Sequence, residues 1–145
     1  MTSERFKMVV ATHVFLIKEN KVLLLRRYKT GYEDGKFSLP AGHLDGNESI
    51  RKATVREAKE EIGVLINEDD LAFASVFHRL APGRESLDFF FTCKKWSGEP
   101  KVMEENKADQ VLWSDSKNLP ENTVHYIKDA VQAYLEGTQY KETTY

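Results

Sequence analysis

The sequence predicts an α/β protein in which a mixed sheet is packed between helices. Several apolar runs rich in β-branched or aromatic residues predict buried strands. Two further segments, 49–62 and 122–135, repeat apolar residues at helical spacing, and each follows predicted strands. Strands followed by single helices are typical of a mixed sheet with helices packed against it.

The first two strands are predicted at 8–17, which reads MVVATHVFLI, and at 21–27, which reads KVLLLRR. The polar pair Glu19-Asn20 separates them, so we expect the two strands to pair antiparallel. A loop at 29–36 follows, and then a short strand at 37–39.

A loop at 41–47 leads into the helix predicted at 49–62. Asn47 and Ser49 are both suitable N-cap residues, and Gly63 is suited to end the helix. An extended apolar stretch at 64–66 follows the helix.

The second half of the chain is predicted to hold three strands and one helix. The remaining elements in order are a strand at 71–79, a loop at 80–86, an aromatic strand at 87–96, an irregular segment at 101–108, a strand at 109–113, the helix at 122–135 and a polar tail at 136–145 that is expected to fray.

Composition limits the classes of protein to consider. A length of 145 residues suits one domain, and a net charge of −2 gives no reason to expect binding to polymeric nucleic acid or to a membrane. The single cysteine, Cys93, excludes an internal disulfide. Because the start of the chain also resembles no export signal, we expect a cytoplasmic protein. We further expect either a monomer or a homodimer.

Three carboxylates crowd one edge of the first predicted helix. At ~100° per residue, Glu57 and Glu61 lie close together with Glu60 to one side, next to the arc that faces the core. Like charges at this spacing repel unless a cation lies between them. Oxygen ligands suit Mg²⁺ or Mn²⁺. The alternative is a solvated acidic face paired with lysines, which would explain a lone Glu-Glu pair.

The spacing of the whole stretch 42–64 argues against that alternative. Gly42 is followed after five residues by Glu48, and after seven more by Arg-Glu-Ala-x-Glu-Glu-x-Gly-Val. This arrangement resembles the Nudix box, with Ala58 standing where a larger aliphatic residue is usual. Pro40-Ala41-Gly42, the strand end Arg26-Arg27 and the segment 96–100 with the downstream Glu104 also resemble the MutT type of Nudix protein.

The resemblance implies a Nudix α/β/α sandwich with a mixed central sheet, and it implies roles for the box residues. Metal ligands would be Glu57, Glu60, Glu61 and Glu104, with the Gly42 carbonyl as a possible addition and Glu105 as the rival of Glu104. Glu57 would be the general base, with Glu61 as the alternative. Glu48 and Arg56 would pair to orient Glu57.

Candidate substrate contacts lie outside the helix. Arg27 matches a nucleotide-contacting arginine of the MutT type, and its alternative is a solvated strand end. Asn122 resembles an asparagine that reads a purine edge, or else it caps the second helix. His43 is a candidate neighbour of phosphate, and Tyr32 is a candidate for stacking on a base. His78 and Arg79 are candidates for shaping the pocket.

The implied activity is Mg²⁺-dependent hydrolysis of a nucleoside diphosphate linked to another moiety. The first expectation is a nucleoside triphosphate that yields a monophosphate and pyrophosphate. The alternatives are another derivative, such as a nucleotide sugar, and a non-catalytic module that senses a nucleotide. Mn²⁺ is a possible substitute for Mg²⁺.

Overall fold

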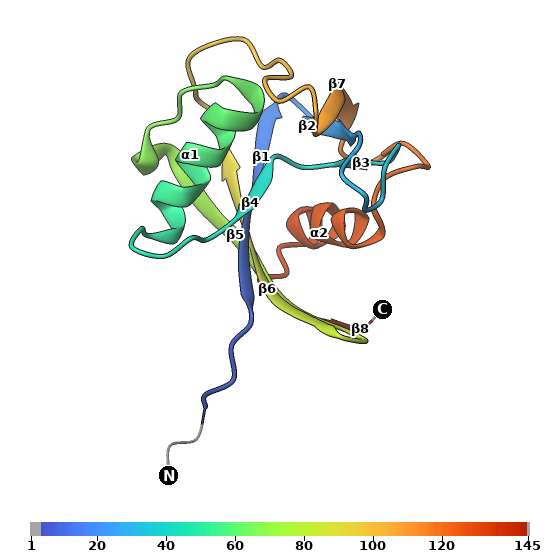
Figure 1. Cartoon of the computed structure of the whole chain (residues 1–145). Coiled ribbons are helices and arrows are strands. Elements are labelled where there is room, and N and C mark those ends of the chain that lie inside the picture. Colours follow the sequence, from blue (N-terminus) through green and yellow to red (C-terminus); the bar gives the residue numbers. More distant parts are fainter. Residues whose placement is uncertain (1–3, 145) are drawn as a thin grey trace.

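A computed structural model describes residues 4–144 of the chain (Figure 1). Two α-helices and a 3₁₀ turn, η1 (Glu68–Asp70), accompany the strands in this range. The helices are α1 (Ile50–Ile62) and α2 (His125–Glu136), and the strands are β1 (Val9–Lys18), β2 (Lys21–Arg27), β3 (Phe37–Ser38), β4 (Ala41–His43), β5 (Leu71–Ala81), β6 (Arg84–Cys93), β7 (Ala108–Asp115) and β8 (Tyr140–Thr144). Across residues 4–144, neither helix is long and apolar enough to cross a membrane.

Strand β1 is the centre of an eight-stranded sheet formed by the described residues. It pairs in parallel with β6 along one side. Its other side is shared, because β4 pairs antiparallel with its first half and β2 with its last residues. The sheet therefore forks along β1 between β4 and β2. Strands β3 and β7 extend the β2 branch, whereas β5 and β8 extend the sheet beyond β6.

The two helices cover opposite faces of this sheet (Figure 1). Along β1, Val14 and Leu16 pack in the cluster that contains Ile62 of α1, whereas Phe15 packs in the cluster that contains Ile127 of α2. Successive side chains of a strand point to opposite faces, so a strand covered on both sides is largely apolar along its whole length. The apolar run at 8–17, interrupted only by Thr12 and His13, follows from this placement.

Helix α1 has clear signals at both ends. The Ser49 side chain accepts a hydrogen bond from the Lys52 N–H, 3.1 Å away. Gly63 ends the helix with φ 72°, in the left-handed conformation that glycine adopts without strain. The helix buries Ala58 and Ile62 against the sheet, which fixes the direction of the acidic edge beside them.

The predicted fold class is confirmed, and most predicted elements appear within a few residues of their expected ends. The strands at 8–17, 21–27 and 37–39 are confirmed, as are those at 71–79, 87–96 and 109–113 and both helices. The antiparallel pairing of the first two strands is also confirmed. Of the two candidate N-caps, Ser49 is the one used.

Four expectations were wrong. The segment 80–86 is not a loop, because β5 and β6 run through it and only Pro82 and Gly83 turn the chain. The described part of the tail does not fray, since 140–144 forms β8 in parallel with β5. The segment 41–47 contains the short strand β4. Asn122 does not cap α2, which begins after Val124 without a side-chain cap.

Substitution at Ile62 tests the packing of α1. The side chain is fully buried, so Ile62→Ala should lower the free energy of unfolding by about 2–5 kcal/mol in a urea titration. Lys59→Ala, at an exposed position of the same helix, is the matched control and should change stability far less. Equal losses in both variants would contradict the assigned packing.

Candidate active site

A cavity of about 540 Å³ opens where the sheet forks, and we call it the carboxylate cavity. Glu57 and Glu61 line it from α1, and Glu104 lines it from the segment before β7. Gly42 and His43 border it from β4. Residues far apart in the chain therefore place three carboxylates on one cavity.

The approach of Glu57 to β4 requires a glycine at position 42. A Cβ atom at Gly42 would lie 2.1 Å from Cδ of Glu57 and 2.3 Å from its Oε1. Because the φ angle of Gly42 is not positive, the requirement comes from space and not from backbone conformation. The glycine that begins the predicted box therefore makes room for one of its glutamates.

Glu61 is held one turn farther along α1. Its Oε1 accepts a hydrogen bond from the Ala41 N–H at 2.8 Å. Burial raises the pKa of Glu61 to about 8, and the charges of Glu57 and Glu104 add to the rise. Burial also raises the pKa of Glu57. Carboxyls with such raised pKa values favour a cation as neighbour.

Arg56 links the surrounding acids. It donates from Nε and Nη2 to both oxygens of Glu48, at 3.1 and 2.6 Å. Its Nη1 donates to Glu57 at 2.8 Å and to Glu60 at 3.3 Å. The hydrogen bonds from Arg56 hold the pKa of Glu48 below its usual value. The predicted pairing of Glu48 with Arg56 is therefore present, and Nη1 of the same arginine contacts Glu57.

The remaining predicted metal ligands are placed unequally. The Glu60 side chain is half exposed and turns to Arg56, and it does not line the carboxylate cavity. Glu104 lines the cavity, with Lys107 Nζ 3.5 Å from its carboxylate. Its rival Glu105 is exposed and lies outside the cavity lining. The position of Glu104 suits a metal ligand better than that of Glu105.

The donor set fits a hard divalent cation. Glu57, Glu61 and Glu104 offer oxygen atoms on one cavity, as Mg²⁺ and Mn²⁺ prefer. Within residues 4–144, no three His, Cys, Asp or Glu side chains form a ready-made metal cage. Glu57 is instead turned to Arg56, and Glu61 to the Ala41 N–H. A bound cation would compete with these two contacts.

The predicted substrate contacts are divided between two places. Arg27 and His43 border the carboxylate cavity. Arg27 donates from Nε to the Tyr32 carbonyl at 2.6 Å, and its guanidinium lies 5.3 Å from the centre of the Tyr32 ring. Asn122 is exposed and donates from Nδ2 to the Gly35 carbonyl at 3.0 Å. Asn122 therefore anchors the loop that carries Tyr32, and it lines neither this cavity nor the two beside it.

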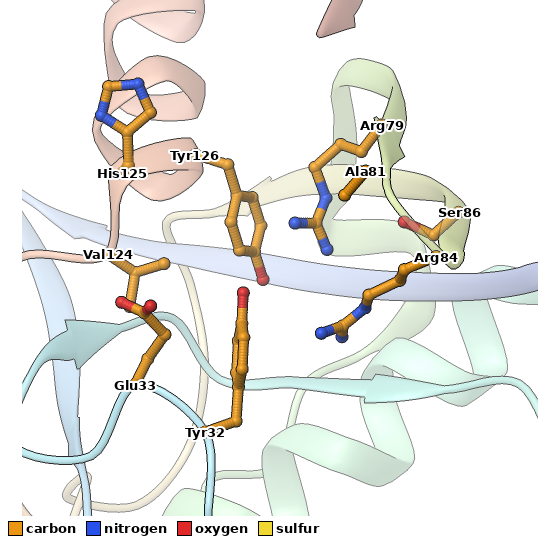
Figure 2. A pocket seen from close by; sticks show the side chains of 9 residues that line it. All are labelled: Tyr32, Glu33, Arg79, Ala81, Arg84, Ser86, Val124, His125 and Tyr126. Carbon is orange, nitrogen blue, oxygen red and sulfur yellow. The ribbon is translucent and has the colours of Figure 1, made fainter. Parts of the chain in front are cut away.

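Two smaller cavities continue from the carboxylate cavity. The first, the middle cavity, shares Arg27, Gly42 and His43 with it. The second, the arginine cavity, lies between Tyr32, Arg79, Arg84 and Tyr126 (Figure 2). His78 does not line it and instead bonds to Glu85.

Sequence reasoning identified Tyr32 and Arg79 but missed Arg84, Tyr126 and the buried Asp88. These residues come from the β5–β6 hairpin and α2. Arg84 alone carried a sequence signal, its charge within the segment 80–86 that is predicted to be a loop. Asp88 lies in the predicted strand 87–96 and Tyr126 in the predicted helix 122–135, where neither residue stands out.

A buried polar group lies beneath the middle cavity. His13 Nδ1–H donates to the Phe89 carbonyl at 3.2 Å, and Nε2 accepts from the Tyr126 hydroxyl at 3.2 Å. Burial lowers the pKa of His13 to about 4, although Asp88 lies 3.6 Å away and opposes the shift. Burial also works against ionisation of Asp88, yet the charge and hydrogen bonds of Arg79 and the hydrogen bond from Ser86 hold the pKa of this carboxyl below its usual value. At neutral pH the pair is therefore a neutral imidazole and a carboxylate.

This state of His13 predicts how stability depends on pH. The unfolded chain takes up the histidine proton near pH ~6.5, whereas the native protein takes it up only near pH 4. The free energy of unfolding should therefore fall between these values as the pH is lowered, by up to ~1.4 kcal/mol per pH unit. His13→Gln should make the slope shallower in urea titrations, and the exposed control His125→Gln should not. An unchanged slope in His13→Gln would contradict the buried neutral state.

Comparison with known proteins agrees with this geometry. An ADP-ribose pyrophosphatase from Methanocaldococcus jannaschii is 30% identical over 111 residues, which cover 77% of this chain and 64% of that protein. An 8-oxo-dGTP diphosphatase from Escherichia coli is 27% identical over 97 residues, or 65% of this chain and 71% of that protein. The chain spans 49% of Nudix hydrolase 2 from Arabidopsis thaliana. It therefore covers less than two thirds of this protein and of the Methanocaldococcus jannaschii relative.

The fold is also shared with solved structures. A MutT NUDIX hydrolase from Burkholderia pseudomallei superimposes with a TM-score of 0.81 at 25% identity, over 88% of this chain and 98% of that one. Residues 7–134 match the NUDIX domain as a family. Since this match spans most of the sequence and includes the carboxylate cavity, the chain belongs to the Nudix family.

Proposed function

We propose that this chain is a Mg²⁺-dependent hydrolase of a nucleoside diphosphate linked to another moiety. The foremost substrate class is a nucleoside triphosphate, which would yield a monophosphate and pyrophosphate. The observation that carries the proposal is the grouping of Glu57, Glu61 and Glu104 on one cavity that Arg27 and His43 also border. The cavity thus combines oxygen ligands for a cation with cationic or polar side chains for phosphate.

The acidic residues and Arg56 have distinct proposed roles. A divalent cation, when bound, would neutralise the diphosphate and lower the pKa of a bound water. Glu57, Glu61 and Glu104 would hold it, with Glu60 available from the rim of the site. Arg56 would keep Glu57 in place through its bonds to Glu48 and Glu57. Glu57 is the proposed general base, and Glu61 is the alternative.

A second substrate class has support from one comparison. The archaeal relative at 30% identity is named as an ADP-ribose pyrophosphatase, whereas the Escherichia coli relative is named for 8-oxo-dGTP. A derivative such as ADP-ribose or a nucleotide sugar is therefore the alternative substrate. A non-catalytic sensing role is disfavoured, because Glu57, Glu60 and Glu61 are all present.

We also propose a cellular compartment, a partner and an oligomeric state for the protein. Cys93 is the only cysteine and is buried, which fits a reducing compartment such as the cytoplasm. The proposed partner is a small nucleotide, and the protein would act as a monomer or a homodimer.

A panel of nucleotides tests the function most broadly. Nucleoside triphosphates, ADP-ribose and nucleotide sugars are incubated with Mg²⁺, with Mn²⁺ or with a chelator, and monophosphate and pyrophosphate products are quantified. Turnover with either cation and its loss with the chelator are expected. No turnover of any nucleoside diphosphate derivative would refute the hydrolase.

Substitutions of single glutamates test the site. Glu57→Gln and Glu61→Gln should each lower kcat by about 10²–10⁴-fold, because each removes a charge that holds the cation or takes the proton. Glu104→Gln should also lower it, whereas the exposed Glu105→Gln should remain near the wild-type rate. Similar rates for the two neighbouring variants would refute the choice of Glu104.

Substitution of Gly42 tests the geometry without removing a charge. In Gly42→Ala the new Cβ would meet the Glu57 carboxyl, so the glutamate must move while the fold remains. A displacement of this size should lower kcat by about 10²-fold or more. The thermal midpoint of unfolding is measured alongside, and a folded Gly42→Ala protein with wild-type kcat would contradict the proposed position of Glu57.

A further inference from the structure

The three cavities adjoin one another through shared lining residues. Arg27, Gly42 and His43 border both the carboxylate cavity and the middle cavity. Tyr32 and Arg84 border both the middle cavity and the arginine cavity. A substrate whose diphosphate lies beside the glutamates can therefore extend to the arginines. The middle and arginine cavities measure about 250 and 150 Å³, below the ~300 Å³ at which pockets begin to enclose drug-sized ligands. This size suits a base better than a second nucleotide.

The arginine cavity is built from two arginine–tyrosine pairs (Figure 2). The Arg79 guanidinium lies 3.6 Å from the centre of the Tyr126 ring, and that of Arg84 lies 4.7 Å from the centre of the Tyr32 ring. Figure 2 shows both arginines entering from the β5–β6 hairpin, with the two tyrosine hydroxyls pointing toward one another. Planar groups of this kind suit stacking with another flat ring.

The hydrogen-bonding groups of the two arginines differ in availability. Arg79 is fixed by Asp88, to which Nε and Nη2 donate at 2.9 and 3.3 Å. The hydroxyl of Ser86 donates to the same carboxylate at 2.6 Å. The acceptor capacity of Asp88 is thus largely used inside the protein. Arg84 is exposed, and within residues 4–144 its guanidinium has no hydrogen bond or ion pair.

Glu33 supplies a carboxylate on the side of the cavity opposite the arginines (Figure 2). Lys36 Nζ lies 2.7 Å from it and holds it in place. The cavity therefore presents hydrogen-bond donors on one side and an acceptor on the other. A ligand that fits must carry acceptors and donors on corresponding edges.

We propose that the arginine cavity selects guanine among the bases, with Arg84 as a specificity-determining residue that donates to O6 and N7. This contact is the most common specific contact of arginine with a base edge. The imino and amino groups of guanine would then point toward Glu33. Adenine has an amino donor where guanine has O6, and 8-oxoguanine has an N7–H donor where guanine has an acceptor. Both therefore present a donor to Arg84.

This proposal rests on the proposed function for the placement of the phosphates, but base selection is measured separately. GMP, AMP and 8-oxo-GMP are titrated into the protein in a chelator-containing buffer by calorimetry. GMP should bind about tenfold more tightly than either competitor. Equal affinities for the three monophosphates would overturn the proposal, whether or not the protein hydrolyses anything.

Variants separate base recognition from simple attraction of phosphate. Arg84→Lys keeps the charge but loses the planar fork, so the preference for GMP over AMP should be lost while AMP affinity remains. Arg84→Ala should also remove the preference, and Arg5→Ala is the exposed control that retains it. Equal weakening of GMP and AMP in Arg84→Ala would make Arg84 a phosphate contact, and full retention of the preference in Arg84→Lys would show that its planar fork does not read the base. Either result would overturn the proposal.

Hydrolysis of GTP, ATP and 8-oxo-GTP with Mg²⁺ completes the test. The ratio of kcat/KM for GTP to that for ATP should be about tenfold in the wild type and near one in Arg84→Ala. Selective binding of GMP without any hydrolysis would refute the proposed function alone. Hydrolysis without a preference for guanine would refute the base selection alone.

Discussion

The contact between strand β4 and helix α1 is the constraint on which the site depends. Glu57 lies against Gly42, where a Cβ atom would come within 2.1 Å of the carboxyl carbon of Glu57. One turn later on α1, Glu61 accepts a hydrogen bond from the Ala41 N–H. These contacts exist only if β4 pairs with β1 and α1 packs on the same sheet. The fork of the sheet, the hydrophobic packing of α1 and the glycine at position 42 thus determine together where the carboxylates lie.

The electrostatics of the site follow from that placement. Crowded and partly buried carboxyls resist ionisation, and the pKa of Glu61 is accordingly raised to about 8. Arg56 offsets part of this cost through its contacts with Glu48 and Glu57, yet it does not reach Glu61. A divalent cation would supply the remaining positive charge. Arg56 therefore acts to position the acids. It leaves part of the negative charge of the cavity carboxylates unneutralised, and a bound metal ion would neutralise this charge.

Sequence predicted the parts of this structure whose signals are local. The caps of α1, its apolar face and the apolar run of β1 are local features of the sequence, so helix, central strand and acidic edge were predicted together. Strand β8 was missed because it joins β5 through backbone hydrogen bonds, which need no apolar pattern. The arginine cavity was missed because the β5–β6 hairpin and α2 meet only in the folded chain.

We propose above all that Glu57, Glu61 and Glu104 hold a divalent cation in the folded protein. Electron paramagnetic resonance during a Mn²⁺ titration measures this directly, since bound Mn²⁺ loses the signal of the free ion. The wild-type protein should bind Mn²⁺, and a folded Glu57→Gln/Glu61→Gln double variant should bind it far more weakly. Equal binding of Mn²⁺ by both proteins would contradict a cation site formed by these glutamates.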